Sequence, residues 1–291
     1  MPKLLVTGAS GFLGWNLCQM AAMQWEVYGI YHSRSLTIPN TTLVKADLTN
    51  SQERQNLFQT VQPDAVIHLA AESKPNRCQE QPDLSHRINV IVSREIAELC
   101  ADADIPYVFA SSDQVFNGLN PPYKEDDPIS PVNLYGEQKA LAEVEILQCY
   151  PKAAVCRMPL MFGSASPRAS SFLQPFIQTL RDGRELKLFT DEIRTPASGT
   201  TAAKGLLLAL EKVQGRIHLG GKERISRYDF GRLMVEVFAL PTDGLKTSQQ
   251  QDVKMSAPRP PDVSLDSTKA FAIGYAPLSI REELEALRGS I

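Results

Sequence analysis

The sequence predicts an α/β fold in which a doubly wound parallel sheet is joined to a smaller C-terminal lobe. Short apolar runs alternate with helical patterns through the first 160 residues. Most of these runs are apolar for nearly their whole length, as expected for strands covered on both faces. A glycine-rich turn joins the first run to the first helix. Together these observations favour parallel strands connected by helices.

The strands and helices can be assigned in chain order. The predicted strands cover residues 3–7, 26–32, 42–48, 64–71, 106–112 and 153–159. Between them, apolar residues recur three and four positions apart, which is the helical period. The predicted helices cover residues 15–24, 51–61, 86–104 and 136–150. This regular alternation is typical of a parallel sheet with a helix after each strand.

The pattern changes after residue 160. The predicted elements are helices at 170–183, 200–213, 226–240 and 279–289, and a strand at 215–221. Ser226 and Ser279 stand where a helix N-cap is expected. Glu282, three residues after Ser279, completes a capping box. These signals predict two well-defined helix starts in the C-terminal part.

The same change in pattern suggests how the chain is divided. We assign residues 1–160 to a nucleotide-binding domain and residues 161–291 mainly to a substrate-binding lobe. The chain is expected to return to the large sheet near 200–221. Residues 241–264 are rich in Pro, Gln and Asp and are predicted to form a loop.

Composition excludes several classes of protein. The net charge of −3 argues against a surface for nucleic acid or an anionic membrane. No apolar run reaches the length of a membrane span, and the N-terminal residues lack the apolar core of a signal peptide. The five cysteines form no C-x-x-C pair, which favours reduced thiols. We therefore expect a cytoplasmic protein.

Three glycines follow the first strand. Gly8, Gly11 and Gly14 have the spacing G-x-x-G-x-x-G. The first permits a tight turn, the second lets the backbone approach a pyrophosphate, and the third lets helix and strand pack closely. The helix N-terminus adds free N–H groups and a positive dipole. This turn predicts a Rossmann-type dinucleotide site with contacts from Gly8, Ser10, Gly11, Phe12, Leu13 and Gly14.

The end of the second strand bears on which dinucleotide binds. NAD sites usually place an acid there for the ribose 2′-hydroxyl. This sequence has no acid between Glu26 and Asp47, and it places Ser33 and Arg34 at that point. Both can bind a 2′-phosphate, the arginine through a bidentate contact. NADP is therefore the predicted cofactor. NAD is the alternative, in which case Arg34 is a solvated surface residue.

Four segments in order, TGASGFLG, HLAA, ASSDQVF and LYGEQK, resemble the extended short-chain dehydrogenase/reductases over nearly the whole chain. Within that family, SSDQVFNG, PPYKEDDPISPVNLYGEQKALAE and RPPDVSLDSTK resemble two groups equally. One is the dTDP-4-dehydrorhamnose reductases. The other is the regulatory beta subunits of methionine adenosyltransferase.

The resemblance implies roles for three residues. Tyr135 would protonate the substrate oxygen, Lys139 would lower the pKa of Tyr135 and hold the nicotinamide ribose, and Ser112 would hydrogen-bond the same oxygen. The residues themselves are compatible with this, because positions i and i+4 share a helix face. Ser112 also ends a predicted parallel strand, where such sheets bind ligands. The other implied cofactor contacts are Asp47, Leu48, Ala70, Ala71 and Pro159.

The residues after Ser112 separate reaction types. The sugar-nucleotide 4,6-dehydratases of this family carry Thr-Asp-Glu where this chain has Ser112-Asp113-Gln114. Glutamine cannot abstract a proton, so dehydration would lack its base. Asp113 either contacts the substrate or caps a loop. Arg194 either meets a substrate phosphate or forms a surface salt bridge.

We therefore expect an NADP-dependent oxidoreductase that reduces a nucleotide-linked 4-keto sugar, as a dTDP-4-dehydrorhamnose reductase does in dTDP-L-rhamnose synthesis. Two alternatives stay open: an epimerase of nucleotide sugars, and a non-catalytic regulatory subunit that binds NADP. The expected partner is a small nucleotide-sugar substrate, without nucleic acid or membrane. A homodimer is left open.

Overall fold

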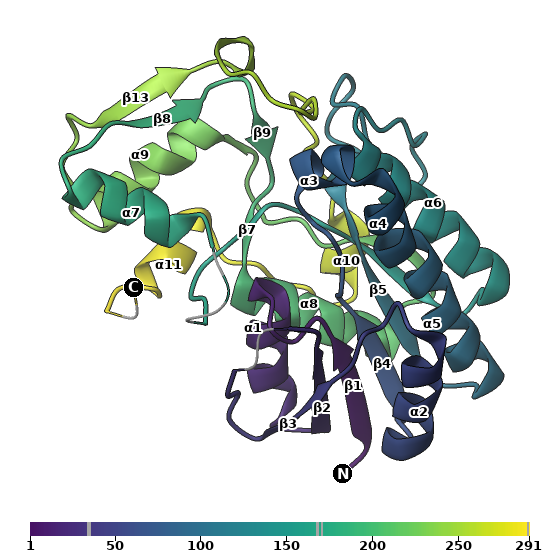
Figure 1. The fold of residues 1–291 in the computed structure, drawn as a ribbon. Coiled ribbons are helices and arrows are strands. Elements are labelled where there is room, and N and C mark those ends of the chain that lie inside the picture. Colours follow the sequence, from purple (N-terminus) through teal and green to yellow (C-terminus); the bar gives the residue numbers. More distant parts are fainter. Residues whose placement is uncertain (34–35, 167–168, 170, 290) are drawn as a thin grey trace.

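The structure is a computed structural model that describes residues 1–33, 36–166, 169, 171–289 and 291. Figure 1 shows a sheet flanked by helices, with a second group of helices and strands at one end of it. Among the described residues, no helix is both long and apolar enough to cross a membrane.

A parallel sheet of seven strands forms the centre of the molecule. Its strands are β1 (Lys3–Thr7), β2 (Glu26–Tyr31), β3 (Thr41–Lys45), β4 (Ala65–His68), β5 (Tyr107–Ser112), β6 (Ala154–Met158) and β11 (Gly215–His218). The spatial order is β11-β6-β5-β4-β1-β2-β3, and neighbouring strands are parallel. The predicted doubly wound α/β fold is confirmed. Strand order reverses between β1 and β4, and sheets of this kind bind ligands beyond the strand ends at such a point.

Helices cover both faces of the sheet. Two of them, α1 (Phe12–Ala21) and α8 (Gly199–Lys212), share a core with Leu4 and Val6. The opposite face carries α2 (Ser51–Val61), α5 (Val92–Asp102) and α6 (Leu134–Cys149). There Leu5 belongs to the core. Leu4, Leu5 and Val6 are all fully buried, which explains why strand β1 is apolar throughout rather than alternating.

The smaller lobe has its own apolar core. Its main elements are α7 (Leu173–Arg181), β8 (Leu186–Phe189), α9 (Arg227–Val237), β13 (Leu245–Ser248) and α11 (Ile280–Glu285). Both predicted N-caps are confirmed. The Ser226 hydroxyl accepts from the Asp229 amide at 3.0 Å. Ser279 and Glu282 form the predicted capping box.

Several short elements complete the fold. They are α3 (Pro75–Glu80), α4 (Pro82–His86), β7 (Met161–Phe162), β9 (Ile193–Arg194), β10 (Ala197–Ser198), β12 (Ile225–Ser226), α10 (Thr268–Ala272) and 3₁₀ turns at Asp113–Val115 and Gln250–Asp252. Strand β10 pairs with β7, and β12 pairs with β9.

Two predicted elements differ from the structure. The helix expected at 86–104 begins earlier, as α4, and passes through a π-helical turn at Arg87–Ile91 before α5. The segment 241–264, expected to be a loop, contains β13, which pairs with β8. That strand contains only one apolar residue, Leu245, so its sequence shows no alternation.

Candidate functional site

A cavity of about 720 Å³ lies at the carboxyl ends of the sheet strands. Predicted site residues far apart in the sequence line this one cavity: Gly8, Ser10, Gly11, Phe12, Leu13, Gly14, Ser33, Asp47, Leu48, Ala70, Ala71, Ser112, Tyr135, Lys139 and Pro159. Arg34 lies outside the described residues. Asp113 and Arg194 do not line this cavity, although Asp113 directly follows Ser112, which does.

The glycine turn is tight and leaves no room for side chains. Gly8 has φ +69°, and a Cβ on it would lie 2.9 Å from the Ala70 nitrogen. A Cβ on Gly14 would lie 2.2 Å from the Gly8 oxygen. The N-cap of α1 is Gly11, which has no side chain to bond the first amides of the helix. These amides can therefore receive a pyrophosphate, so the turn fits the predicted dinucleotide.

An acid is present near the end of β2 after all. The Asp47 carboxylate, which follows β3, lies 3.8 Å from Nε2 of His32, which follows β2. Thr49 donates to Asp47 from its hydroxyl at 2.7 Å and from its amide at 2.9 Å. The hydroxyl bond is the main reason that the pKa of Asp47 is lowered. The sequence pattern missed this proximity, because it arises from the parallel pairing of β2 and β3.

The three predicted catalytic residues come together at the start of α6. Asn133 caps this helix, its side-chain oxygen accepting from the Gly136 amide at 2.9 Å. Tyr135 and Lys139 follow on one helix face and, like Ser112 at the end of β5, are at least 93% buried. The Lys139 ammonium donates to the Ala110 carbonyl at 2.8 Å. This bond ties α6 to the end of β5.

Burial changes the acidity of this group. The pKa of Tyr135 is raised, chiefly by burial, while the Ser112 side chain opposes the rise. This direction is opposite to the expected lowering by Lys139, because desolvation of the phenolate dominates. Burial also lowers the pKa of Lys139 to about 8, although the charge of Glu143 opposes that change. Tyr135 is therefore a protonated phenol at neutral pH.

Asp113 and Arg194 form a buried ion pair. Nε of Arg194 lies 3.6 Å from Oδ2 of Asp113, and each residue is 4% exposed. The surface salt bridge considered for Arg194 is therefore wrong, because neither partner is at the surface. Burial raises the pKa of Asp113 to about 6, and Arg194 opposes that rise. The Ser112 hydroxyl donates to Asp113 at 3.1 Å.

The lining of the cavity also includes residues that were not predicted, among them one charged pair. Glu72 and Arg77 both line it, and their closest charged atoms lie 3.3 Å apart. The charge of Glu72 is one of the effects that raise the pKa of Tyr135. The only sequence signal was that Glu72 directly follows the HLAA segment.

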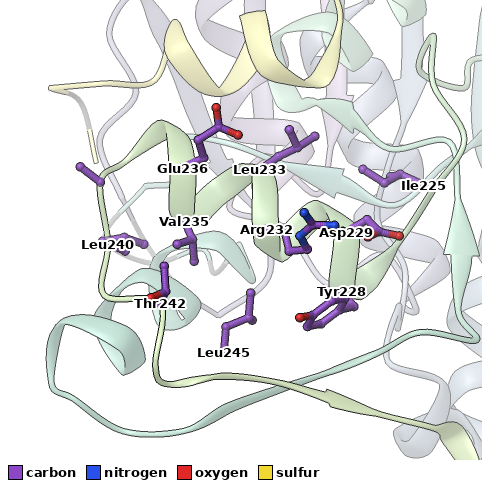
Figure 2. A pocket seen from close by; sticks show the side chains of 11 residues that line it. Ile225, Tyr228, Asp229, Arg232, Leu233, Val235, Glu236, Leu240, Thr242 and Leu245 are labelled. Atoms are coloured by element: carbon purple, nitrogen blue, oxygen red, sulfur yellow. Dashed lines mark ion pairs between the residues drawn. The ribbon is translucent and has the colours of Figure 1, made fainter.

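A second cavity, of about 750 Å³, lies on the lobe beside α9 (Figure 2). Apolar residues such as Leu233 and Leu245 line it together with Asp229 and Arg232, which form an ion pair at 3.6 Å. It contains none of the predicted site residues.

Known proteins resemble this chain over nearly its whole length. The profile of the family described as RmlD substrate binding domain matches residues 2–288. Methionine adenosyltransferase 2 subunit beta from Xenopus laevis is 30% identical, and the match covers 94% of this chain and 82% of that protein. The probable low-salt glycan biosynthesis reductase Agl14 from Haloferax volcanii is 28% identical, with 98% of this chain and 97% of that protein covered.

Solved structures agree with these matches. The crystal structure of a hypothetical dTDP-4-dehydrorhamnose reductase from Sulfolobus tokodaii has a TM-score of 0.85 and 30% identity, covering 96% of this chain and 98% of that chain. The dTDP-4-dehydrorhamnose reductase from Bacillus anthracis, in complex with NADP, has a TM-score of 0.88 and 21% identity, with both chains covered completely. The resemblance seen in the sequence motifs is confirmed.

Proposed function

The chain belongs to the RmlD substrate binding domain family, and on this premise we propose that it is an NADP-dependent reductase of a nucleotide-linked 4-keto sugar. The substrate that we propose first is dTDP-4-dehydrorhamnose, named in the relative from Sulfolobus tokodaii. One observation carries the proposal: the glycine turn opens into the same cavity as Ser112, Tyr135 and Lys139. A dinucleotide and a carbonyl compound could therefore meet there.

The residues divide the proposed work as follows. NADPH, when bound, supplies the hydride. The glycine turn holds its pyrophosphate, and Lys139 binds the nicotinamide ribose. Tyr135 donates its phenolic proton to the substrate oxygen, and its raised pKa keeps that proton in place until then. Ser112 orients the same oxygen, for which its hydroxyl must turn away from Asp113.

Gln114 argues against dehydratase chemistry in this proposal. Its side-chain oxygen accepts from Nδ2 of Asn133 at 3.1 Å, so it supports the start of α6. An amide at this position cannot remove a proton from a sugar. We therefore expect no 4-keto product when the protein is incubated with dTDP-glucose and NAD.

A regulatory subunit is the second candidate. Its support is the identity of 30% with methionine adenosyltransferase 2 subunit beta. Against it, Ser112, Tyr135 and Lys139 are all present and share one cavity. A third candidate, a nucleotide-sugar epimerase, would use the same residues and retain its cofactor.

An assay of NADPH consumption separates the three. The purified protein is mixed with NADPH and a panel of nucleotide-linked keto sugars, and absorbance at the nicotinamide band is followed. A reductase consumes NADPH in proportion to one sugar of the panel. An epimerase interconverts its sugar without net consumption. A regulatory subunit does neither and binds a larger enzyme. No consumption with any keto sugar would contradict the proposed reductase.

A further inference from the structure

His68 lies fully buried beside the glycine turn, at the end of β4. It stands opposite Thr7, the residue before Gly8, in the parallel pairing of β1 and β4. Nδ1 of His68 lies 2.8 Å from the Thr7 hydroxyl, and its Nε2 lies 3.1 Å from the Ser93 hydroxyl on α5. The ring thus connects the strand before the glycine turn to a helix on the sheet face.

The surrounding hydrogen bonds determine where each proton lies. The Thr7 oxygen already accepts from the amides of Leu69 at 3.0 Å and Ala70 at 3.1 Å. Its own hydrogen is therefore free to point to Nδ1 of His68. On the other side, the Ser93 hydroxyl donates to the Asn89 carbonyl at 2.8 Å. The Ser93 oxygen must then accept from His68, which carries its hydrogen on Nε2.

This arrangement requires a neutral ring. Burial lowers the pKa of His68 to about 3, and the charge of Lys139 acts in the same direction. A neutral imidazole with hydrogen on Nε2 satisfies every polar atom of the group. A charged ring would place a second hydrogen on Nδ1, facing the hydrogen of Thr7.

The group also lies against the wall of the cofactor cavity. Gly8, which directly follows Thr7, and Ala70, whose amide donates to the Thr7 hydroxyl, both line that cavity. The fit between them is close, because a Cβ on Gly8 would lie 2.9 Å from the Ala70 nitrogen. Rotation of the Thr7 side chain about its Cα–Cβ bond would move the hydroxyl oxygen away from the amides of Leu69 and Ala70.

We propose that His68 is a positioning residue for the dinucleotide site: its Nδ1 fixes the Thr7 hydroxyl, which holds the turn after β4 against the glycine turn. Only the expected effect on NADPH affinity rests on the proposed function. The positioning itself concerns the free protein. His68 acts through Thr7 and touches neither the substrate nor the reacting atoms.

Two substitutions separate the two sides of the ring. His68→Asn keeps an acceptor near the position of Nδ1 and removes the donor to Ser93. His68→Gln keeps a donor near the position of Nε2 and removes the acceptor for Thr7. Both are neutral and polar, and Asn is the smaller, so a general loss of packing should affect His68→Asn at least as strongly as His68→Gln. Thr7→Val and Thr7→Ser form a second pair, one lacking the hydroxyl and one retaining it.

The first measurement is hydrogen exchange of the Leu69 and Ala70 amides in the free protein. We expect exchange about tenfold faster in His68→Gln and Thr7→Val, as the loss of one buried hydrogen bond implies. His68→Asn and Thr7→Ser should exchange at nearly the wild-type rate. Equal rates in the two His68 variants would overturn the proposal, whatever the protein binds.

The second measurement is NADPH affinity by fluorescence titration. His68→Gln should raise the Kd about tenfold, and His68→Asn should restore it to within about threefold of wild type. Unchanged affinity in His68→Gln, with wild type binding normally, would refute the link to the cofactor site. A wild-type protein that binds no NADPH would refute the proposed cofactor, and hydrogen exchange would still decide the positioning role. Should either His68 variant fail to fold, the Thr7 pair decides both measurements.

Discussion

Arg194 on β9, outside the large sheet, forms an ion pair with Asp113, which directly follows Ser112, the serine proposed to be catalytic. Its Nε lies 3.6 Å from Oδ2 of Asp113, while one of its terminal nitrogens donates to the Pro260 carbonyl at 3.3 Å. Asp113 in turn accepts from the Ser112 hydroxyl. A change at β9 can therefore affect the hydroxyl that is proposed to orient the substrate.

The first prediction concerns this ion pair. Arg194→Gln leaves the Asp113 carboxylate buried without its cation, which should cost about 3–5 kcal/mol of unfolding free energy at pH 8. The folded pKa of Asp113, about 6, already exceeds that of an unfolded aspartate, and it should rise further in the variant. Stability from protonated Asp113 is present at low pH and is lost as pH rises through its folded pKa. The deficit should therefore shrink at pH 5.

Urea denaturation of wild type and variant at both pH values measures this difference. Arg184→Gln is the matched control, because Arg184 pairs with Asp182 at 2.8 Å but is exposed. It should have little effect at either pH. An Arg194→Gln deficit that is equal at pH 5 and pH 8 would contradict the account.

The second prediction concerns the proton donor. Tyr135→Phe keeps the packed ring but removes the phenolic proton, so kcat should fall about 10²–10⁴-fold. NADPH affinity should change only a few-fold. Lys139→Met should lower both kcat and NADPH affinity, because that lysine is also proposed to bind the ribose. Turnover with the keto sugar that wild type reduces, together with NADPH titration, tests both variants. Near-normal turnover in Tyr135→Phe would contradict the assignment of Tyr135 as the proton donor.

The third prediction tests the 2′-phosphate assignment, which comes from the sequence alone. Arg34→Ala should weaken NADPH binding more than NADH binding, by about 1.5–3 kcal/mol for a lost charged hydrogen bond. Titration with both cofactors measures the difference. The structure adds a competing feature, since the Asp47 carboxylate lies 3.8 Å from Nε2 of His32, which follows β2. Equal weakening of both cofactors would remove the assignment to Arg34.

Local pattern predicted much of the fold and of this cavity. The glycine turn, each strand end and the spacing of Tyr135 and Lys139 are each encoded by one short segment of the sequence. The parallel sheet then brings those ends together. Polar partners on different strands could not be predicted, because they depend on strand order and register. Asp47 beside His32 and Thr7 opposite His68 are both of this kind.

The buried ion pair between Arg194 and Asp113 was still harder to predict from the sequence. Arg194 is 81 residues from Asp113, as their sequence numbers show, and no local pattern links them. An isolated arginine in a polar segment is usually at the surface. On that basis a surface salt bridge was considered for Arg194, which is in fact buried. The short strand β13 was not predicted for a different reason. Its segment contains almost no apolar residues, and it forms a strand because it pairs with β8.

The fourth prediction concerns a tether beside Ser112, the serine proposed to be catalytic. Ser111 donates to the Glu143 carboxylate at 2.6 Å, and Arg157 holds the other oxygen of that group at 2.8 Å. Ser111→Ala should release the end of β5 and lower kcat several-fold, while the Glu143–Arg157 pair remains. A hydrogen bond to a charged group also contributes about 1.5–3 kcal/mol, so the free energy of unfolding should fall as well.

The control for this variant is Ser267→Ala. Ser267 is also buried, and its hydroxyl accepts from the Gly220 amide at 2.9 Å, away from the cavity. Its loss should reduce stability without reducing turnover measured well below the melting temperature. If both serine variants keep wild-type kcat, the tether has no role in positioning Ser112.

The fifth prediction concerns acid stability and the two buried histidines. Burial lowers the pKa of both His68 and His218 to about 3, and the neighbouring charges of Lys139 and Arg157 act in the same direction. His218 accepts from Arg157 at 3.2 Å and donates to the Tyr123 carbonyl at 3.1 Å, so it too is held neutral.

A histidine whose folded pKa is depressed takes up its proton mainly in the unfolded chain. Its contribution to stability is therefore complete above the unfolded pKa of about 6.5 and is lost as pH falls toward 3. Each histidine should reduce the free energy of unfolding by about 1.4 kcal/mol per pH unit across that window.

Asp113 acts in the opposite direction between about pH 6 and 4, so the histidine effect is isolated by comparison with a variant. Between pH 7 and pH 5, wild type should lose about 2 kcal/mol more than His68→Asn, which has no group that titrates there. Urea denaturation of both proteins across this range measures the difference. Parallel stability curves would mean that His68 is not held neutral in the fold.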